Sequence, residues 1–253
     1  ILKTSQGEIL GILTDTAMPF VLSKVPPLSE QRRREAFLKA QDDLLSYGIT
    51  SIMDAGENLE NLEILKKAYE NGEMKLRSYE MLLATTNQDV RFIEAGNKPV
   101  TGLYGDRLSI AAVKVVSDGS LGSRSAWLLE DYNDRAGHKG NGRYTDEELY
   151  TILYRAYTNG FQVGVHAIGD AAVRQVIDQV ERVIKANPPK DHRFRIEHFQ
   201  IVNAKDIPRA IELGIVPAMQ AVHATSDMNM AEDRVGPVTI KSSYAWRTVI
   251  DCH

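Results

Sequence analysis

The stretch VGVHAIGD (Val163–Asp170) joins a predicted strand to a predicted helix. Small and β-branched residues lead into His166, and a Gly-Asp pair follows. The next run, AAVRQVIDQVERVIK, has apolar side chains at helical spacing, so we predict a helix with Asp170 as its N-cap. An imidazole at this boundary is either a core histidine with satisfied polar atoms or a functional group at a strand end.

The same alternation of strand and helix recurs along the chain. Strands are predicted at 49–56, 75–84, 109–120, 162–167, 193–200 and 215–220. Helices are predicted at 29–46, 59–71, 89–95, 145–159, from 170 onward and at 203–213. This pattern predicts an α/β protein with a parallel sheet. No G-x-G-x-x-G turn follows any strand, which favours a TIM-type (β/α)8 barrel over a dinucleotide-binding fold. Six units predict an incomplete barrel.

Composition narrows the class of protein. The 253 residues carry a formal net charge of -4, which argues against nucleic-acid and membrane partners. The single cysteine, Cys252, permits no intrachain disulfide and no zinc site built on thiolates. We therefore expect a cytoplasmic protein that acts on a small molecule. Because the chain begins at Ile1, a targeting segment on a longer precursor is compatible with this expectation.

Three side chains are predicted to meet at one rim of the barrel. Alternation along a strand places Lys114, His166 and His198 on inward faces, and barrel active sites lie where strands end. Two imidazoles on adjacent strand ends favour metal ligation over a structural role, since zinc accepts imidazole nitrogen. The same alternation places Arg193, Arg195 and Glu197 on the helix-facing side, where apolar residues are expected, and a pair between Arg195 and Glu197 is one interpretation of these charges.

A long stretch rich in Gly, Asp and Arg follows the third strand, from Asp118 to Arg143. Loops of this length are usually functional or disordered. Asp118 either shapes a substrate cleft or belongs to a glycine-rich turn. Arg124 either binds a substrate carboxylate or is solvated. His223 lies past the last strand and is a candidate substrate contact.

Five segments resemble, in order, the amidohydrolase superfamily. They are GITSIMDAG, VKVVSDGSLGSRSA, VGVHAIGDAAV, RIEHFQ and QAVHATSDMNMAEDRVG. The nearest branch is amidohydrolase family 3, which includes N-substituted formamide deformylase-like enzymes. The opening GEILGILTDTAM is similar to that branch's segment ahead of the second barrel strand. The resemblance divides the chain into that segment, residues 1–28, and a partial barrel catalytic domain, residues 29–253, which carries about strands 2–7.

The resemblance implies a metal-dependent hydrolase of C–N bonds other than peptide bonds. Its ligands are an HxH pair on strand 1, a lysine on strand 4 that is often carboxylated, histidines on strands 5 and 6, and an aspartate on strand 8. Lys114, His166 and His198 match the central three. The HxH pair and the proton-shuttling aspartate have no counterpart in this chain. The resemblance thus implies one or two divalent ions, most simply zinc, in an intact parent, and a nearly inactive fragment here.

Two other functions fit the same residues. Lys114 is also suited to a Schiff-base enzyme with a lysine nucleophile, and a non-catalytic module would keep the barrel shape for binding alone. Barrel strands 2 and 7 would form open edges, which invite pairing with another chain, so a homo-oligomer is expected.

Overall fold

A computed structural model describes residues 3–11, 13, 17–84, 91–93, 95–188 and 190–252. Its strands are β1 (Ser51–Glu57), β2 (Arg77–Leu83), β3 (Val100–Gly102), β4 (Leu108–Val116), β5 (Gln162–Ala167), β6 (Arg195–His198) and β7 (Val216–Ala218). The longer helices are α2 (Glu30–Ser46), α3 (Leu59–Glu70), α6 (Asp146–Thr158), α7 (Asp170–Lys185) and α10 (Ala231–Thr239). The shorter ones are α1 (Met18–Leu22), α5 (Leu103–Asp106), α8 (Asp206–Glu212), α9 (Val222–Ser226), η2 (Ile240–Ser242) and α11 (Trp246–Asp251). Of the helix predicted at 89–95, residues 91–93 are helical, while residues 89, 90 and 94 lie outside the described residues.

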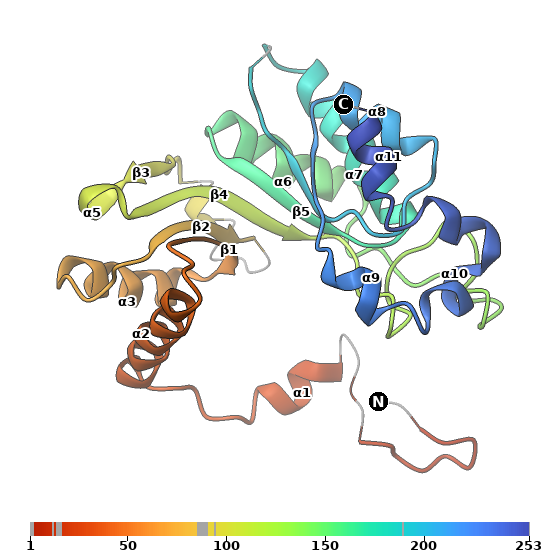
Figure 1. Cartoon of the computed structure of the whole chain (residues 1–253), viewed down its shortest axis with the longest axis horizontal. Helices are drawn as coiled ribbons and strands as arrows, with labels where there is room; N and C mark the ends of the chain where they lie inside the picture. The colour runs from red at the N-terminus through yellow and green to blue at the C-terminus, as the bar shows by residue number, and fades with distance from the viewer. Residues whose placement is uncertain are drawn as a thin grey trace.

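The sheet has the order β1-β2-β4-β5-β6-β7, and every neighbouring pair is parallel. The short β3 pairs antiparallel with β4. Figure 1 shows the curved sheet running from β1 and β2 through β4 to β5. The edge strands of this order, β1 and β7, do not pair with each other. The predicted α/β class and incomplete barrel are confirmed. None of the helices in the described part of the chain has the length and apolar character needed to cross a membrane.

One continuous core lies between the sheet and the helices. Val113 and Val115 of β4 and Val163 and Val165 of β5 are fully buried in it. From α7, the core contains Val173, Val176, Ile177 and Val180 of the predicted apolar stripe, and Val183 as well, while Ile184 of that stripe is partly buried against the core. Burial of these side chains is the main force that holds α7 against the sheet and so fixes where β5 ends.

Local signals account for several helix starts. The predicted capping box begins α6, since the Thr145 side chain accepts from the Glu148 backbone N–H and the Glu148 carboxylate accepts from the Thr145 backbone N–H. The prediction of Asp170 as an N-cap is wrong. Gly169 is the N-cap of α7, and the buried Asp170 carboxylate instead accepts a hydrogen bond from the backbone N–H of Leu129. Its role is to hold the long loop against the helix.

The prediction of which β6 side chains face the helices and which face the barrel interior is also wrong. Phe194, just before the strand, and Ile196 pack in the core between sheet and helices. Arg195 and Glu197 occupy the opposite, interior face, where they form an ion pair with Nε to Oε1 at 2.8 Å. The pairing considered for these two residues is therefore present, but on the interior face, where a buried carboxylate needs a charged or hydrogen-bonding partner.

A second buried carboxylate lies on β2. Glu80 is 2 % exposed and accepts a hydrogen bond from the hydroxyl of Ser78 through one oxygen. Its other oxygen is buried without a hydrogen-bond partner among the described residues. Burial, with an added contribution from the carboxylates of Asp54 and Glu57, raises the pKa of Glu80 to about 7. The folded protein therefore favours the protonated form of this side chain.

This burial predicts a loss of stability as the pH rises. Between the ordinary glutamate pKa of 4.5 and the folded pKa of about 7, Glu80 binds a proton in the folded state and releases it on unfolding. The free energy of unfolding should therefore be higher below this window and fall across it, by about 3 kcal/mol from this residue. In Glu80→Gln this pH dependence should disappear, with a gain in stability at pH 8.

Urea unfolding at pH 5 and pH 8 checks the prediction. The difference between the two pH values should be smaller in Glu80→Gln than in the wild type. Glu70→Gln, at an exposed position on α3, is the control and should behave like the wild type. An unchanged pH dependence in Glu80→Gln would contradict the assignment.

Candidate metal centre

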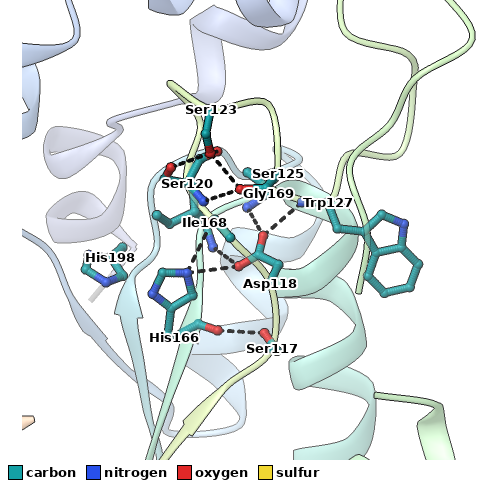
Figure 2. Close-up of polar contacts among 12 residues, drawn as sticks. Ser117, Asp118, Ser120, Ser123, Ser125, Trp127, His166, Ile168, Gly169 and His198 are labelled. Atoms are coloured by element: carbon teal, nitrogen blue, oxygen red, sulfur yellow. Dashed lines mark hydrogen bonds and ion pairs between the residues drawn. The ribbon is translucent and has the colours of Figure 1, made fainter. Parts of the chain in front are cut away.

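His166 and His198 meet at the carboxyl ends of β5 and β6. Their ring centroids lie 4.6 Å apart, with the rings at 74°. Figure 2 shows the two imidazoles side by side below the loop that follows β4. The prediction that these histidines converge at one rim is confirmed.

Asp118 supports His166 from the loop after β4. Its carboxylate is fully buried and accepts from the backbone N–H groups of Trp127, Ile168 and Gly169, at 2.9, 3.1 and 2.8 Å (Figure 2). One of its oxygens also lies 3.2 Å from Nε2 of His166. Only glycine fits at position 169, since a Cβ there would overlap the backbone of Trp127. The carboxylate thus ties the β4 loop, the start of α7 and His166 together.

The hydrogen bonds of His166 define its free nitrogen. Nε2 lies 3.2 Å from the carbonyl oxygen of Gly119 as well as from Asp118. Both neighbours are acceptors, so Nε2 carries the proton and donates. Nδ1 is left with the lone pair that a metal ion needs. The side chain is 15 % exposed, which leaves a route for a ligand.

His198 reaches the site through its backbone conformation. Its φ is +78°, and Phe199 follows at +44°, so the chain turns sharply as β6 ends. This left-handed conformation is uncommon for side chains with a Cβ and is frequent at functional sites. It lets His198 face His166 although Ile196, two residues earlier, faces the helices.

Gln220 orients the ring of His198. Nδ1 of His198 lies 2.8 Å from Oε1 of Gln220, whose amide nitrogen donates to the carbonyl of Ala218. Nδ1 therefore carries the proton and Nε2 has the free lone pair. Burial, and next the neighbouring His166, lower the pKa of His198 to about 4. The ring is neutral at pH 7, the form that binds metal.

Lys114 lies on the interior face of β4, in register with Gly164 of β5 and Leu83 of β2. It is 6 % exposed, and its ammonium makes no hydrogen bond with a residue that the structure describes. Burial lowers the pKa of Lys114, while the carboxylate of Glu197 opposes that shift. A buried amine of this kind is suited to lose its proton.

The donor set fits part of a metal site. His166 and His198 provide two imidazole nitrogens, and zinc accepts such donors together with an oxygen or nitrogen from a third residue. Among the described residues, no group of three or more His, Cys, Asp or Glu side chains is arranged to hold a metal ion. The geometry therefore brings two imidazoles together, and Lys114 lies on β4, the strand that pairs with β5.

The three predicted substrate contacts have different surroundings. The carboxylate of Asp118 is buried and already bonded, so it serves as a support rather than as a free group. Arg124 forms two hydrogen bonds with Asp134, at 3.0 and 2.8 Å, which occupy its guanidinium. His223, on α9, lies near the site, with its ring 5.8 Å from that of His198 and Nδ1 3.7 Å from Asp227.

Strand alternation and motifs do not identify several residues at the site. The sequence predicts Gln220 only as the end of a strand, and it assigns no role to Ser117 or Glu197. The Ser117 hydroxyl donates to the carbonyl of His166 at 2.6 Å (Figure 2). Gln220 could have been identified from its position at a strand end, because the same criterion identifies His166.

Comparison with known proteins agrees with this arrangement. A family model described as "Amidohydrolase family" matches residues 1–251. The protein YtcJ of Bacillus subtilis (strain 168), which is named as a putative amidohydrolase, is 32% identical over 99% of this chain and 46% of its own length. The protein LONG AFTER FAR-RED 3 of Arabidopsis thaliana is 30% identical over 99% of the chain and 44% of its own length. The chain thus spans less than half the length of these relatives.

Solved structures of metal-dependent hydrolases have a fold similar to that of this chain. An uncharacterized metal-dependent hydrolase from Pyrococcus furiosus superposes with a TM-score of 0.79 at 27% identity, over 99% of this chain and 52% of that one. A second, from Pyrococcus horikoshii OT3, gives a TM-score of 0.77 at 27% identity, over 89% of this chain and 44% of that one. The match of the family model over residues 1–251, with the relatives and folds found, shows that this chain belongs to the amidohydrolase family.

Proposed function

We propose that the protein is a metal-dependent hydrolase that cleaves an amide, formamide or cyclic amide C–N bond. The observation that supports this most directly is the pair of strand-end imidazoles, His166 and His198, 4.6 Å apart, each with one nitrogen fixed by an acceptor. Membership of the amidohydrolase family and similarity to metal-dependent hydrolases add independent support.

The roles of the chain's own residues follow from their contacts. Nδ1 of His166 and Nε2 of His198 would hold a divalent ion, zinc in this proposal, with Lys114 as a third ligand in carboxylated form. When bound, such an ion supplies a Lewis acid for the scissile carbonyl and lowers the pKa of a bound water. Asp118 and Gly119 hold the ring of His166, and Gln220 holds that of His198. These partners fix which nitrogen of each ring faces the ion.

We further propose that this chain forms the central part of a longer catalytic domain. The chain spans less than half the length of its relatives. Two imidazoles and a lysine are fewer ligands than the family's set, so an HxH pair and an aspartate would come from other segments. By itself the chain should bind metal weakly and turn over little substrate.

A Schiff-base mechanism is the second candidate. The lowered pKa of Lys114, caused first by burial, makes its amine more nucleophilic at neutral pH. Such an enzyme would form an imine with a carbonyl substrate, which borohydride reduces to a stable adduct. The hydrolase proposal predicts no adduct at Lys114.

Metal depletion of the full-length protein tests the proposal. A panel of amides, formamides and cyclic imides would be screened before and after treatment with a chelator, and again after zinc is added back. We expect hydrolysis to fall by about 100-fold or more without the ion and to return with it. Hydrolysis that is indifferent to the chelator, or a borohydride adduct at Lys114, would contradict it.

A further inference from the structure

A cavity of about 350 Å³ lies beside His166, between the end of β5 and the loop after β4. Its polar lining comes from Asp118, Ser120, Ser123, Ser125 and Arg143, together with the imidazole of His166. Val116, Leu13 and Met18 provide an apolar part. The cavity therefore opens onto the same ring that the proposed function assigns to the metal.

The three serine hydroxyls form a chain within this cavity. Ser123 Oγ lies 2.7 Å from Ser120 Oγ and 2.7 Å from Ser125 Oγ (Figure 2). The backbone N–H of Ser120 donates to Ser125 Oγ, which holds the loop in this shape. The Ser123 hydroxyl also lies 3.2 Å from the carbonyl oxygen of Ser120; when it donates there, Ser120 and Ser125 donate to Ser123 and no hydroxyl proton is free. When Ser123 instead donates to one of the other two hydroxyls, one hydroxyl proton is left to turn toward an acceptor group.

Arg143 contributes a positive charge to the cavity. Its backbone N–H donates to the carbonyl of Ser117 at 2.8 Å, which anchors it at the base of the same loop. Its guanidinium forms no hydrogen bond or ion pair with a residue that the structure describes. Arg124, on the neighbouring part of the loop, differs because Asp134 occupies its guanidinium. Arg143 is thus the arginine whose donors are available.

One carboxylate, that of Asp118, lines the cavity but forms no ion pair with Arg143. Asp118 is fully buried, and its oxygens accept from three backbone N–H groups and lie beside Nε2 of His166. Both of its oxygens are therefore committed to the loop and the imidazole. A guanidinium and hydroxyl donors remain to face the cavity, and this combination suits an anion with two acceptor oxygens.

We infer that this cavity binds a carboxylate group of the substrate, so that the hydrolysed amide carries a carboxylate close to its scissile bond. This inference rests on the proposed hydrolase function. Arg143 forms a bidentate pair with the carboxylate, and the serine hydroxyls donate to it. The apolar side chains of Val116 and Met18 accommodate the carbon atoms between the carboxylate and the amide at His166.

Ligand-observed NMR on this chain tests the inference without turnover. The probes are N-acetylglycine and its neutral analogue N-acetylglycinamide, which differ in the carboxylate. We expect the acid to bind at least about fivefold more tightly than the amide at low salt. Arg143→Ala should remove this preference, Arg143→Lys should retain part of it, and Ser123→Ala should reduce it.

Arg77→Ala is the matched control, because Arg77 is an exposed arginine at the opposite, amino end of β2. It should leave the preference unchanged, and circular dichroism should show the same folded spectrum for each variant. Equal binding of acid and amide, or a preference that survives in Arg143→Ala, would overturn the inference. The measurement needs no metal and no hydrolysis. Its result therefore tests the carboxylate site separately from the proposed hydrolase function.

Discussion

Replacing His198 with alanine in the full-length protein is expected to lower kcat/KM by about 10³-fold or more and to remove most of the bound metal. The substitution deletes one of the two imidazoles at the rim and leaves Gln220 without its partner. His166→Ala should have a similar effect, since its ring provides the other nitrogen. Metal analysis after dialysis, paired with the rate of hydrolysis, measures both losses.

His192→Ala is the control for these two variants. His192 precedes β6, where Nε2 lies 2.8 Å from the carbonyl oxygen of Leu213 and Nδ1 accepts from the backbone N–H of Phe194. Both of its nitrogens are occupied away from the rim. This variant should retain its metal and most of its activity. Full metal content in His198→Ala would show that the ion is held elsewhere.

Replacing Asp118 with alanine is expected to lower the free energy of unfolding by about 3–6 kcal/mol. The substitution leaves the backbone N–H groups of Trp127, Ile168 and Gly169 without their acceptor in a fully buried site. Each unsatisfied buried donor costs about 1–3 kcal/mol. The substitution should remove the contact that holds the loop after β4 against the start of α7.

Urea unfolding of this chain measures that loss. The control is Asp131→Ala, because the Asp131 carboxylate accepts one backbone hydrogen bond, from Gly137, at an exposed position. We expect about 1 kcal/mol or less from the control. Equal effects of the two substitutions would mean that Asp118 does not hold the loop as described.

Much of the fold could be predicted because its signals are local. The apolar stripe of α7 and the capping box of α6 each lie within a few turns of helix, where spacing alone determines which side chains share a face. The facing of β5 follows from alternation, since Val163, Val165 and Ala167 all pack toward the helices. These elements fix the end of β5 and with it the position of His166.

The facing of β6 could not be predicted in the same way. Alternation counted back from His198 assumes that the strand continues regularly to that residue. The left-handed φ of His198 breaks the alternation at the last residue, and no residue in RFRIEHFQ signals this turn. The charges of Arg195 and Glu197 are the one contrary signal in the sequence, because charged side chains rarely face a helix layer.

The candidate site was predictable at its strand ends and not in its loop. The convergence of His166 and His198 could be predicted because parallel strands bring their carboxyl ends to one rim. The roles of Asp118 and Arg124 depend on how the long loop folds back on itself. Asp118 reaches the backbone at the start of α7, and Arg124 finds Asp134 within the loop. Contacts of this kind carry no periodic signal in the sequence.

Nitrogen-15 NMR of the histidine rings in the full-length protein, recorded with and without one equivalent of zinc, tests the central claim most directly. We predict metal-bound shifts for Nδ1 of His166 and Nε2 of His198, because the other nitrogen of each ring is bonded to Asp118 and Gly119 or to Gln220. The ring of His192 should not respond. Unchanged spectra for His166 and His198 in the zinc-loaded protein, or binding through the opposite nitrogens, would contradict the account.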